Sequence, residues 1–191
     1  MSLMSLMSLM PLMPLIQVGQ KAPAFALRDT TGAVHHLKDY LGRPVALYFY
    51  PKDDTPGCTD QACQFRDRTR DFDRATAIVL GVSPDSVESH AAFAEKLDLR
   101  FPLLVDTFTR KGTPKTCDRY GVWQEKALYG KKYFGVVRTT YLIDEAGKVA
   151  RRWDRVSVDG HVAEVLSAVH EIRRVIPQSA RSMLGAAAGL A

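Results

Sequence analysis

The 191-residue chain has only three cysteines, Cys58, Cys63 and Cys117. So small and odd a number argues against a disulfide-stabilised secreted scaffold, and at least one thiol cannot pair within the chain. Free thiols suit a reducing compartment, so we expect a cytoplasmic protein. The five histidines show no metal-like spacing with the cysteines, and we therefore expect no metal and no cofactor.

The sequence also lacks a long apolar run and a cluster of one charge. Twenty-six basic and 21 acidic side chains are interspersed and leave a net charge of +5. We therefore expect neither a membrane span nor nucleic-acid binding. A hydrophobic content of 46% and a length of 191 residues suit one globular domain with a proper core.

The amino-terminal 16 residues repeat Met-Ser-Leu three times, and the first charged side chain is Lys21. A secretory signal would need a basic region and a small-residue cleavage site, and neither is clear. We interpret residues 1–16 as a disordered leader or a cloning remnant, with periplasmic or other targeting as the alternative. The domain is expected over 17–176, and the small-residue-rich segment 177–191 as a frayed tail.

Apolar runs alternate with helix-favouring runs along the domain. The expected strands are 25–27, 34–37, 45–50, 75–82, 101–106, 136–144 and 149–153. The expected helices are 59–74, one beginning at Ser83 or Asp85 as N-cap, a short one within 111–120, and 161–176. This order predicts an α/β domain with a central mixed sheet flanked by helices and an N-terminal β-hairpin.

The segment from Pro51 to Cys63 joins the apolar strand 45–50 to the helix that follows it. Cys58 therefore lies where a strand ends and a helix begins. Backbone N–H groups have no internal partner there, and the helix dipole favours negative charge, so the thiolate is favoured. We interpret Cys58 as a reactive nucleophile. The alternative is an inert buried side chain.

The pattern Pro51-x-x-x-Thr55-x-x-Cys58 resembles the active-site loop of the peroxiredoxins. The longer string that ends at Asp67 is similar to the Q-type, or bacterioferritin-comigratory-protein, branch. Further matches lie at 120–123, 129–133 and 135–140, and the resemblance covers roughly Val18 to Ile176. It implies a thioredoxin-like fold and a peroxidase that reduces hydrogen peroxide and organic hydroperoxides. The implied reductant is thioredoxin or a similar dithiol.

Three residues of this loop have expected roles beside Cys58. The hydroxyl of Thr55 can donate one hydrogen bond and accept another, which suits it to orient a peroxide oxygen; the alternative is a helix cap. Pro51 would terminate the strand, and the resemblance implies that it shields the thiolate from water. Gly57 lets the backbone approach a ligand closely.

Arg138 is a charge inside the otherwise apolar run 136–143, where it needs a partner. Near Cys58, its guanidinium would stabilise the thiolate and the developing charge on the peroxide oxygens. The alternative is a structural ion pair. The resemblance favours the catalytic role, although Thr139 follows where serine is expected.

Cys63 is the expected resolving cysteine. On an unbroken helix, five residues separate two Cα atoms by roughly 8.6 Å, beyond the ~7 Å that a disulfide tolerates. An intramolecular disulfide between Cys58 and Cys63 would therefore require the first turns of the helix to unwind; the alternative is that Cys63 is a buried helix residue. We read Cys117 as structural, with a backup resolving role as the weaker alternative.

Two other functions stay open from the residues alone. A thiol–disulfide oxidoreductase would favour Cys-x-x-Cys, whereas four residues separate Cys58 from Cys63. A metal-binding module on the same fold would need a positioned histidine or methionine ligand. Because both cysteines lie in one chain, a partner subunit is not needed, and we expect a monomer.

Overall fold

The computed structural model describes residues 14–128 and 130–175. Residues 1–13 of the expected leader and the whole expected tail lie outside this range. The strands are β1 (Ala26–Arg28), β2 (Val34–His36), β3 (Val45–Phe49), β4 (Ile78–Ser83), β5 (Leu103–Val105), β6 (Trp123–Leu128), β7 (Lys131–Val136), β8 (Thr139–Ile143) and β9 (Val149–Trp153). The helices are η1 (Leu37–Tyr40), α2 (Pro56–Asp67), α3 (Thr69–Arg74), α4 (Val87–Lys96), α5 (Lys115–Arg119) and α6 (His161–Val175).

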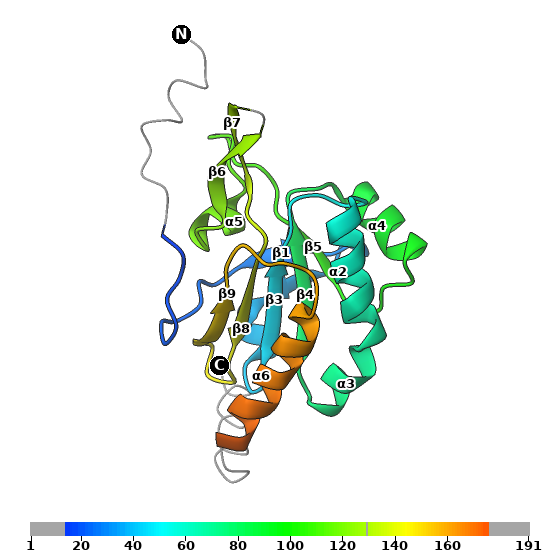
Figure 1. The fold of residues 1–191 in the computed structure, drawn as a ribbon, viewed down its shortest axis with the longest axis vertical. Coiled ribbons are helices and arrows are strands. Elements are labelled where there is room, and N and C mark those ends of the chain that lie inside the picture. Colours follow the sequence, from blue (N-terminus) through cyan, green and yellow to red (C-terminus); the bar gives the residue numbers. More distant parts are fainter. Residues whose placement is uncertain (1–13, 129, 176–191) are drawn as a thin grey trace.

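Seven strands form one central sheet in the order β2-β1-β5-β4-β3-β8-β9 (Figure 1). Strands β3, β4 and β5 run parallel to one another, while β8 and β9 add antiparallel strands on one side and β1 and β2 on the other. The α2 and α4 segments are the crossovers that parallel neighbours require. The mixed sheet, the flanking helices and the N-terminal hairpin are as the sequence predicted.

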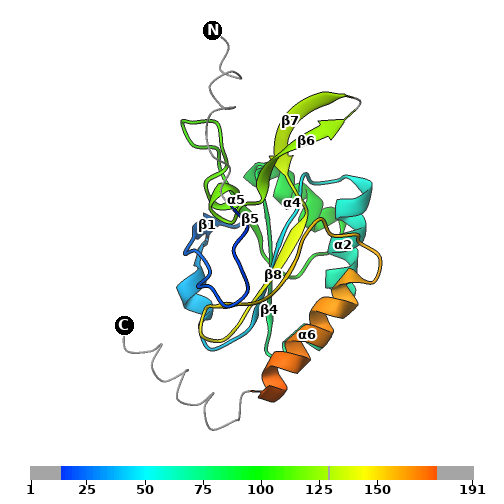
Figure 2. The same cartoon turned by 60° about the vertical axis from the view of Figure 1, so that its left-hand side comes forward.

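Strand β3 is buried on both faces and divides the core in two. Ala46, Tyr48 and Tyr50 face a cluster that includes side chains of α2, α3, α4 and α6. Leu47 and Phe49 face a second cluster, built with α5 and the N-terminal segment. Figure 2 shows α2 and α6 on one side of the sheet and α5 on the other. This explains the continuous apolar run of β3, because alternate side chains enter different clusters.

Two expected helix boundaries differ in the structure. The expected helix 59–74 is two helices, because the chain leaves α-helical geometry at Arg68, where φ is −105° and ψ is 9°. The N-cap of α4 is Ser86, whose Oγ accepts a hydrogen bond from the Ser89 N–H at 3.2 Å, so the choice of Ser83 or Asp85 was wrong. Ser83 is still part of β4, and its hydroxyl donates to Asp85 instead.

The hairpin of β6 and β7 was not expected from the sequence. It forms a separate two-stranded sheet that projects beyond one end of the central sheet (Figure 1). The expected strand 136–144 is therefore interrupted: β7 ends at Val136 and β8 begins at Thr139. The Val137 N–H donates to the Val122 carbonyl at 2.8 Å, and the Val156 N–H donates to the Arg138 carbonyl at 3.0 Å. Arg138 thus lies between two strands and not inside one.

Residues 15 and 16, which we expected to belong to the leader, contact the domain. Leu15 and Ile16 pack against the second core cluster, and Arg152 donates to the Ile16 carbonyl at 2.8 Å.

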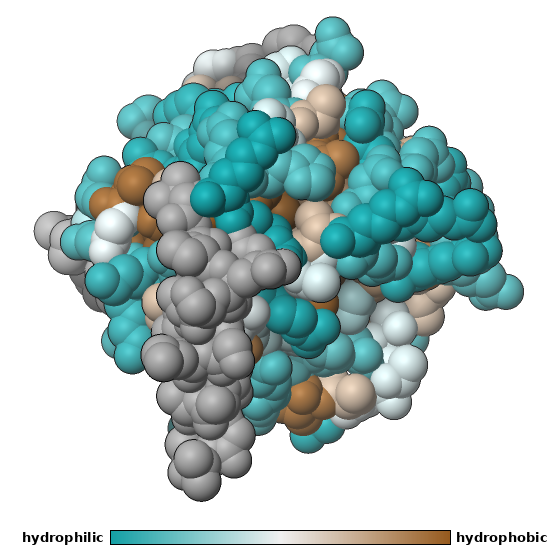
Figure 3. Space-filling view, turned by 90° about the horizontal axis from the view of Figure 1, so that it is seen from below, coloured by the Kyte–Doolittle hydropathy of each residue, from teal (hydrophilic) through white to brown (hydrophobic). Residues whose placement is uncertain are grey.

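Among the residues described, no helix combines the length and the hydrophobicity needed to cross a membrane. The view from below in Figure 3, from the end opposite to the β6–β7 hairpin, is mainly hydrophilic, with hydrophobic residues in separate patches.

Candidate active site

Helix α2 begins beside the end of β3 and places Cys58 in its first turn. Thr55 is the N-cap residue, with extended backbone at φ −99° and ψ 149°, and Pro56 occupies the first helical position, where its missing N–H costs nothing. The N–H groups of Gly57 and Cys58 lie in this turn, before any i−4 acceptor is available within the helix. Cys58 is 2% exposed. Its sulfur is therefore held in a protected position at the positive end of α2, as predicted.

Arg138 reaches this sulfur from the segment between β7 and β8. One guanidinium nitrogen donates to Cys58 Sγ at 3.2 Å, and the other donates to Gln61 Oε1 at 2.6 Å. A Cβ atom at Gly57 would lie 3.3 Å from the guanidinium, so glycine leaves room for this approach. We predicted that Gly57 lets the backbone approach a ligand; the group that lies against it in the structure is the Arg138 side chain. The structure brings together Cys58 and Arg138, 80 residues apart in the chain.

Gln61 is a site residue that the sequence reasoning missed. It follows Cys58 by three residues, so the two side chains share a face of α2. Its side chain is fully buried and fixes the guanidinium through Oε1. The signal was present, because a polar side chain one turn after a nucleophilic cysteine lies where it can orient the arginine partner of that cysteine.

Thr55 and Pro51 lie in the connection between β3 and α2. The Thr55 hydroxyl donates to the Lys52 carbonyl at 3.1 Å, and its side chain makes no helix-capping hydrogen bond. The lone pairs of its oxygen therefore remain available as acceptors. Pro51 is half-buried in the bend that follows β3. Its expected role as a shield stays a prediction.

The β6–β7 hairpin brings a second cation, Lys126, to the edge of the site. Burial lowers the pKa of Lys126, and repulsion from Arg138 lowers it further, while Cys58 acts in the opposite direction. Its Nζ donates to the Val136 carbonyl at 3.3 Å. Nothing in the sequence pointed to this position, because the hairpin itself was not expected.

Helix α2 also carries Cys63, which is half-buried, and both of its cysteines are free thiols. The helix runs unbroken from Pro56 to Asp67, so the geometric separation predicted for Cys58 and Cys63 applies to this state. Cys117 lies in the second core cluster and is fully buried. Burial first, and then the nearby Asp106 carboxylate, raise its pKa well above the usual range of a thiol. This environment fits the structural role that we expected for Cys117.

A buried sulfur at a helix start, with a guanidinium against it, on a mixed sheet flanked by helices, defines an enzyme that uses a cysteine nucleophile. The model of the AhpC/TSA family matches residues 18–152. The chain belongs to this family, and it is a thiol-dependent peroxidase of the peroxiredoxin type. Its thioredoxin-like fold is the one that the sequence predicted.

Three comparisons illustrate the likeness. Peroxiredoxin Bcp of Bacillus subtilis is 45% identical over 157 residues, which are 82% of this chain and 97% of that protein. A Coxiella burnetii relative whose name includes peroxiredoxin bcp is 51% identical over 151 residues, or 79% and 97% of the two chains. A solved structure of Xanthomonas campestris bacterioferritin comigratory protein, studied for alkyl peroxide reduction, matches with a TM-score of 0.73 and 36% identity over 81% of this chain and 98% of that one.

Proposed function

We propose that Cys58 is the residue that attacks the peroxide, and that the enzyme reduces hydrogen peroxide and organic hydroperoxides. The observation that carries this proposal is the 3.2 Å contact between Arg138 and the Cys58 sulfur in the first turn of α2. A guanidinium and free helix N–H groups stabilise an anionic sulfur, and the same donors can stabilise the negative charge that moves onto the peroxide oxygens.

In the first step, the Cys58 thiolate attacks the terminal oxygen of the hydroperoxide. A sulfur–oxygen bond forms and the oxygen–oxygen bond breaks, so sulfur becomes a sulfenic acid and the other oxygen leaves as alkoxide or hydroxide. That oxygen takes a proton and departs as alcohol or water. Thr55, whose hydroxyl donates to Lys52, accepts a hydrogen bond from the peroxide, and Arg138 donates to the oxygens. Both side chains thus align the bond that breaks.

In the second step, the Cys63 thiol attacks the Cys58 sulfenic acid, a disulfide forms, and one water leaves. Because both sulfurs lie on one continuous helix, the first turns of α2 must unwind before the bond can form. Oxidation removes the negative charge on the Cys58 sulfur, so its contact with Arg138 weakens. This happens at the stage of the cycle at which the first turns of α2 must unwind. A dithiol such as thioredoxin then returns the disulfide to two thiols by exchange.

The remaining expectations belong to the same proposal. Pairing of two cysteines within α2 needs no second subunit, which supports a monomer. A dithiol donor is maintained in a reducing compartment, which supports a cytoplasmic location. For the substrate, the Xanthomonas campestris relative, which was studied for alkyl peroxide reduction, supports alkyl hydroperoxides as well as hydrogen peroxide.

The test uses three matched serine variants, Cys58→Ser, Cys63→Ser and Cys117→Ser. We expect peroxide consumption with a dithiol donor to disappear in the first and to persist in the third. Mass spectrometry of peroxide-treated protein should find a Cys58–Cys63 crosslink in the wild type and a sulfenic acid on Cys58 in Cys63→Ser. Equal consumption by wild type and Cys58→Ser would refute the nucleophile. A crosslink between Cys58 and Cys117 in the wild type would refute the resolving residue.

A further inference from the structure

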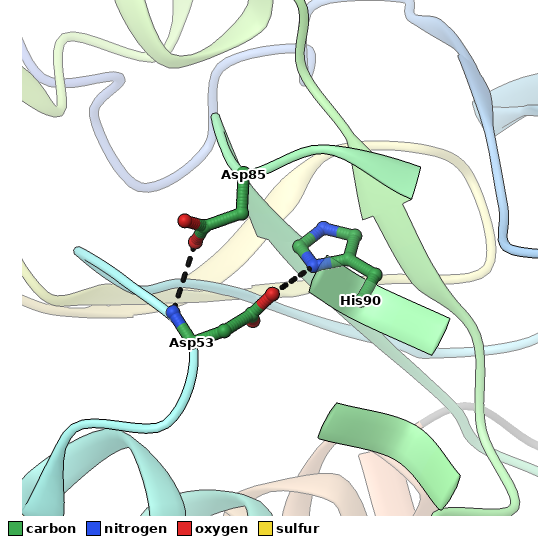
Figure 4. A group of neighbouring side chains, drawn as sticks. All are labelled: Asp53, Asp85 and His90. Atoms are coloured by element: carbon green, nitrogen blue, oxygen red, sulfur yellow. Dashed lines mark hydrogen bonds and ion pairs between the residues drawn. The ribbon is translucent and has the colours of Figure 1, made fainter. Parts of the chain in front are cut away.

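Asp53 is a buried carboxylate five residues before Cys58, in the loop that enters α2. It is 5% exposed and accepts three short hydrogen bonds from other parts of the chain. The Tyr50 hydroxyl donates to Oδ1 at 2.7 Å, and the Ser89 hydroxyl donates to Oδ2 at 2.7 Å. The ring of His90, which is fully buried, lies with Nδ1 2.7 Å from Oδ2 (Figure 4). The loop is thereby joined to helix α4.

The backbone of Asp53 is held at the same place. Its N–H donates to Asp85 Oδ2 at 2.9 Å (Figure 4). The Ser83 hydroxyl donates to the same oxygen at 2.6 Å. The polar atoms of Asp53, Asp85 and His90 lie within 4.8 Å of one another. Their hydrogen bonds are made to one another and to neighbouring protein groups. The cluster is therefore a connected network that fixes position, and both the main chain and the side chain of Asp53 belong to it.

Asp53 and His90 are the central pair of this network. The Leu104 carbonyl, 3.3 Å from His90 Nε2, can only accept, so this nitrogen carries a proton. Burial alone would raise the pKa of Asp53, but hydrogen bonds from His90, Tyr50 and Ser89 and the charge of His90 outweigh it, and the pKa is lowered. Asp53 Oδ2 and His90 Nδ1 therefore form a short hydrogen bond between two buried side chains. Removing either partner would leave the other buried and unpaired, so the pair holds its place.

The network fixes one end of the segment that contains Cys58 and Cys63. Thr55, which follows Asp53 by two residues, donates to the carbonyl of Lys52, on the other side of Asp53. At the far end, Arg66 donates at 2.9 Å to the carbonyl of Leu97, the C-cap residue that follows α4. The first turns of α2, which must unwind for disulfide formation, lie between these two anchors.

We infer that Asp53 and His90 are positioning residues for the peroxidase reaction: their buried hydrogen bond holds the loop so that Thr55 and the first turn of α2 meet Arg138. This inference rests on the proposed function. It assigns the pair two opposite effects on the cycle. The pair favours attack on peroxide, which needs the folded first turn. It opposes disulfide formation, which needs that turn to open.

The test separates the two steps in stopped-flow experiments. The first step is measured as sulfenic acid formation on Cys58 in a Cys63→Ser parent, and the second as disulfide formation after a peroxide pulse in the parent with both cysteines. Asp53→Asn keeps the shape and removes the charge, and His90→Gln removes the partner. Asp54→Asn is the matched control, because it makes the same change one residue away, where the side chain is 58% exposed and forms a surface ion pair with Lys96.

We expect Asp53→Asn and His90→Gln to slow sulfenic acid formation by roughly 10- to 100-fold, since a small misplacement of reacting groups can cost that much. Disulfide formation should become faster in the same variants, and hydrogen exchange at the Thr59 amide, which donates to the Thr55 carbonyl at 2.8 Å, should accelerate. Asp54→Asn should match the parent in all three measurements. Slower sulfenic acid formation together with faster disulfide formation is the result expected of a pair that positions the loop.

Two results would overturn this inference and leave the proposed function intact. One is rates for both steps that equal those of Asp54→Asn. The other is a proportional fall in both rates, which a smaller folded fraction would cause and which a merely structural pair would show. A Cys63→Ser parent that forms no sulfenic acid on Cys58 would instead overturn the proposed function, and this inference with it. The Cys63→Ser parent thus tests the proposed function, and the Asp53→Asn and His90→Gln variants test the inference.

Discussion

Replacing Arg138 tests the electrostatic basis of the site. Its guanidinium lies 3.2 Å from the Cys58 sulfur and 2.6 Å from Gln61 Oε1. Two unit charges at this distance interact by about 5 kcal/mol at an effective dielectric constant of roughly 20. Arg138 is half-buried, so solvent screens part of this interaction. Loss of one preorganised donor in other enzymes costs about 2.7–4 kcal/mol, which is the better guide here.

We therefore expect Arg138→Met to lower the second-order rate constant for peroxide by about 100- to 1000-fold. Arg138→Lys keeps the charge but cannot bridge the sulfur and Gln61 together, and should lose roughly tenfold. The assay is stopped-flow oxidation of the Cys63→Ser protein at several peroxide concentrations, with urea unfolding to confirm the folded state. Arg74→Met, at a position where the arginine side chain is 78% exposed, is the control.

A rate constant for Arg138→Met within about threefold of the wild type would refute the reasoning, provided that the variant unfolds at the same urea concentration as the wild type. Equal losses in Arg138→Met and Arg138→Lys would refute a purely electrostatic role. That result would indicate that the geometry of the bridge between Cys58 and Gln61 matters more than the charge of the side chain.

Three further predictions concern stability and the edge of the site. Burial, above all, lowers the pKa of His161 to about 4, whereas an unfolded histidine titrates near 6.5, so the unfolded state takes up the proton first and stability falls as pH drops between these values. In urea unfolding, the wild type should lose about 2 kcal/mol between about pH 7 and about pH 5, and His161→Gln much less; equal losses would contradict the assignment. Gly81→Ala should lower the free energy of unfolding by about 1–3 kcal/mol, because its Cβ would lie 2.7 Å from Leu103 and 2.8 Å from the Tyr48 ring; an unchanged urea midpoint would show that these side chains move aside freely. Lys126→Met should lower the peroxide rate constant roughly threefold at low salt and less at high salt, with the exposed Lys131→Met as control; a loss that does not depend on salt would rule out a charge effect.

The sequence was informative where a local pattern has one physical outcome. The apolar run before Pro51 predicted a central strand and the polar run after Cys58 predicted a helix, so the position of Cys58 at their junction could be predicted from the residues alone. The resemblance pointed to Arg138, which does contact the Cys58 sulfur, but its expected place inside a strand was wrong. An apolar run gives no sign of where ladder pairing stops, and the Val137 N–H bonds to Val122 instead of continuing a strand.

The residues that were missed depend on contacts between distant parts of the chain. Asp53 and His90 are 37 residues apart, and each alone looks like an ordinary loop carboxylate or helix histidine. The β6–β7 hairpin was missed because its strands mix charged and apolar residues without regular alternation, which a strand that packs on a core would show. Lys126 could not be placed at the site without that hairpin.

The proposed cycle requires the first turn of α2 to be both firm and able to open. Two interactions hold this turn in place, and they respond differently to oxidation of Cys58. The contact between Arg138 and Cys58 depends on the charge of the sulfur and weakens once a neutral sulfenic acid has formed. The Asp53–His90 pair does not involve sulfur and is unchanged by that step. Oxidation thus releases the part of α2 that must unwind, while the loop that must receive the next peroxide stays in place.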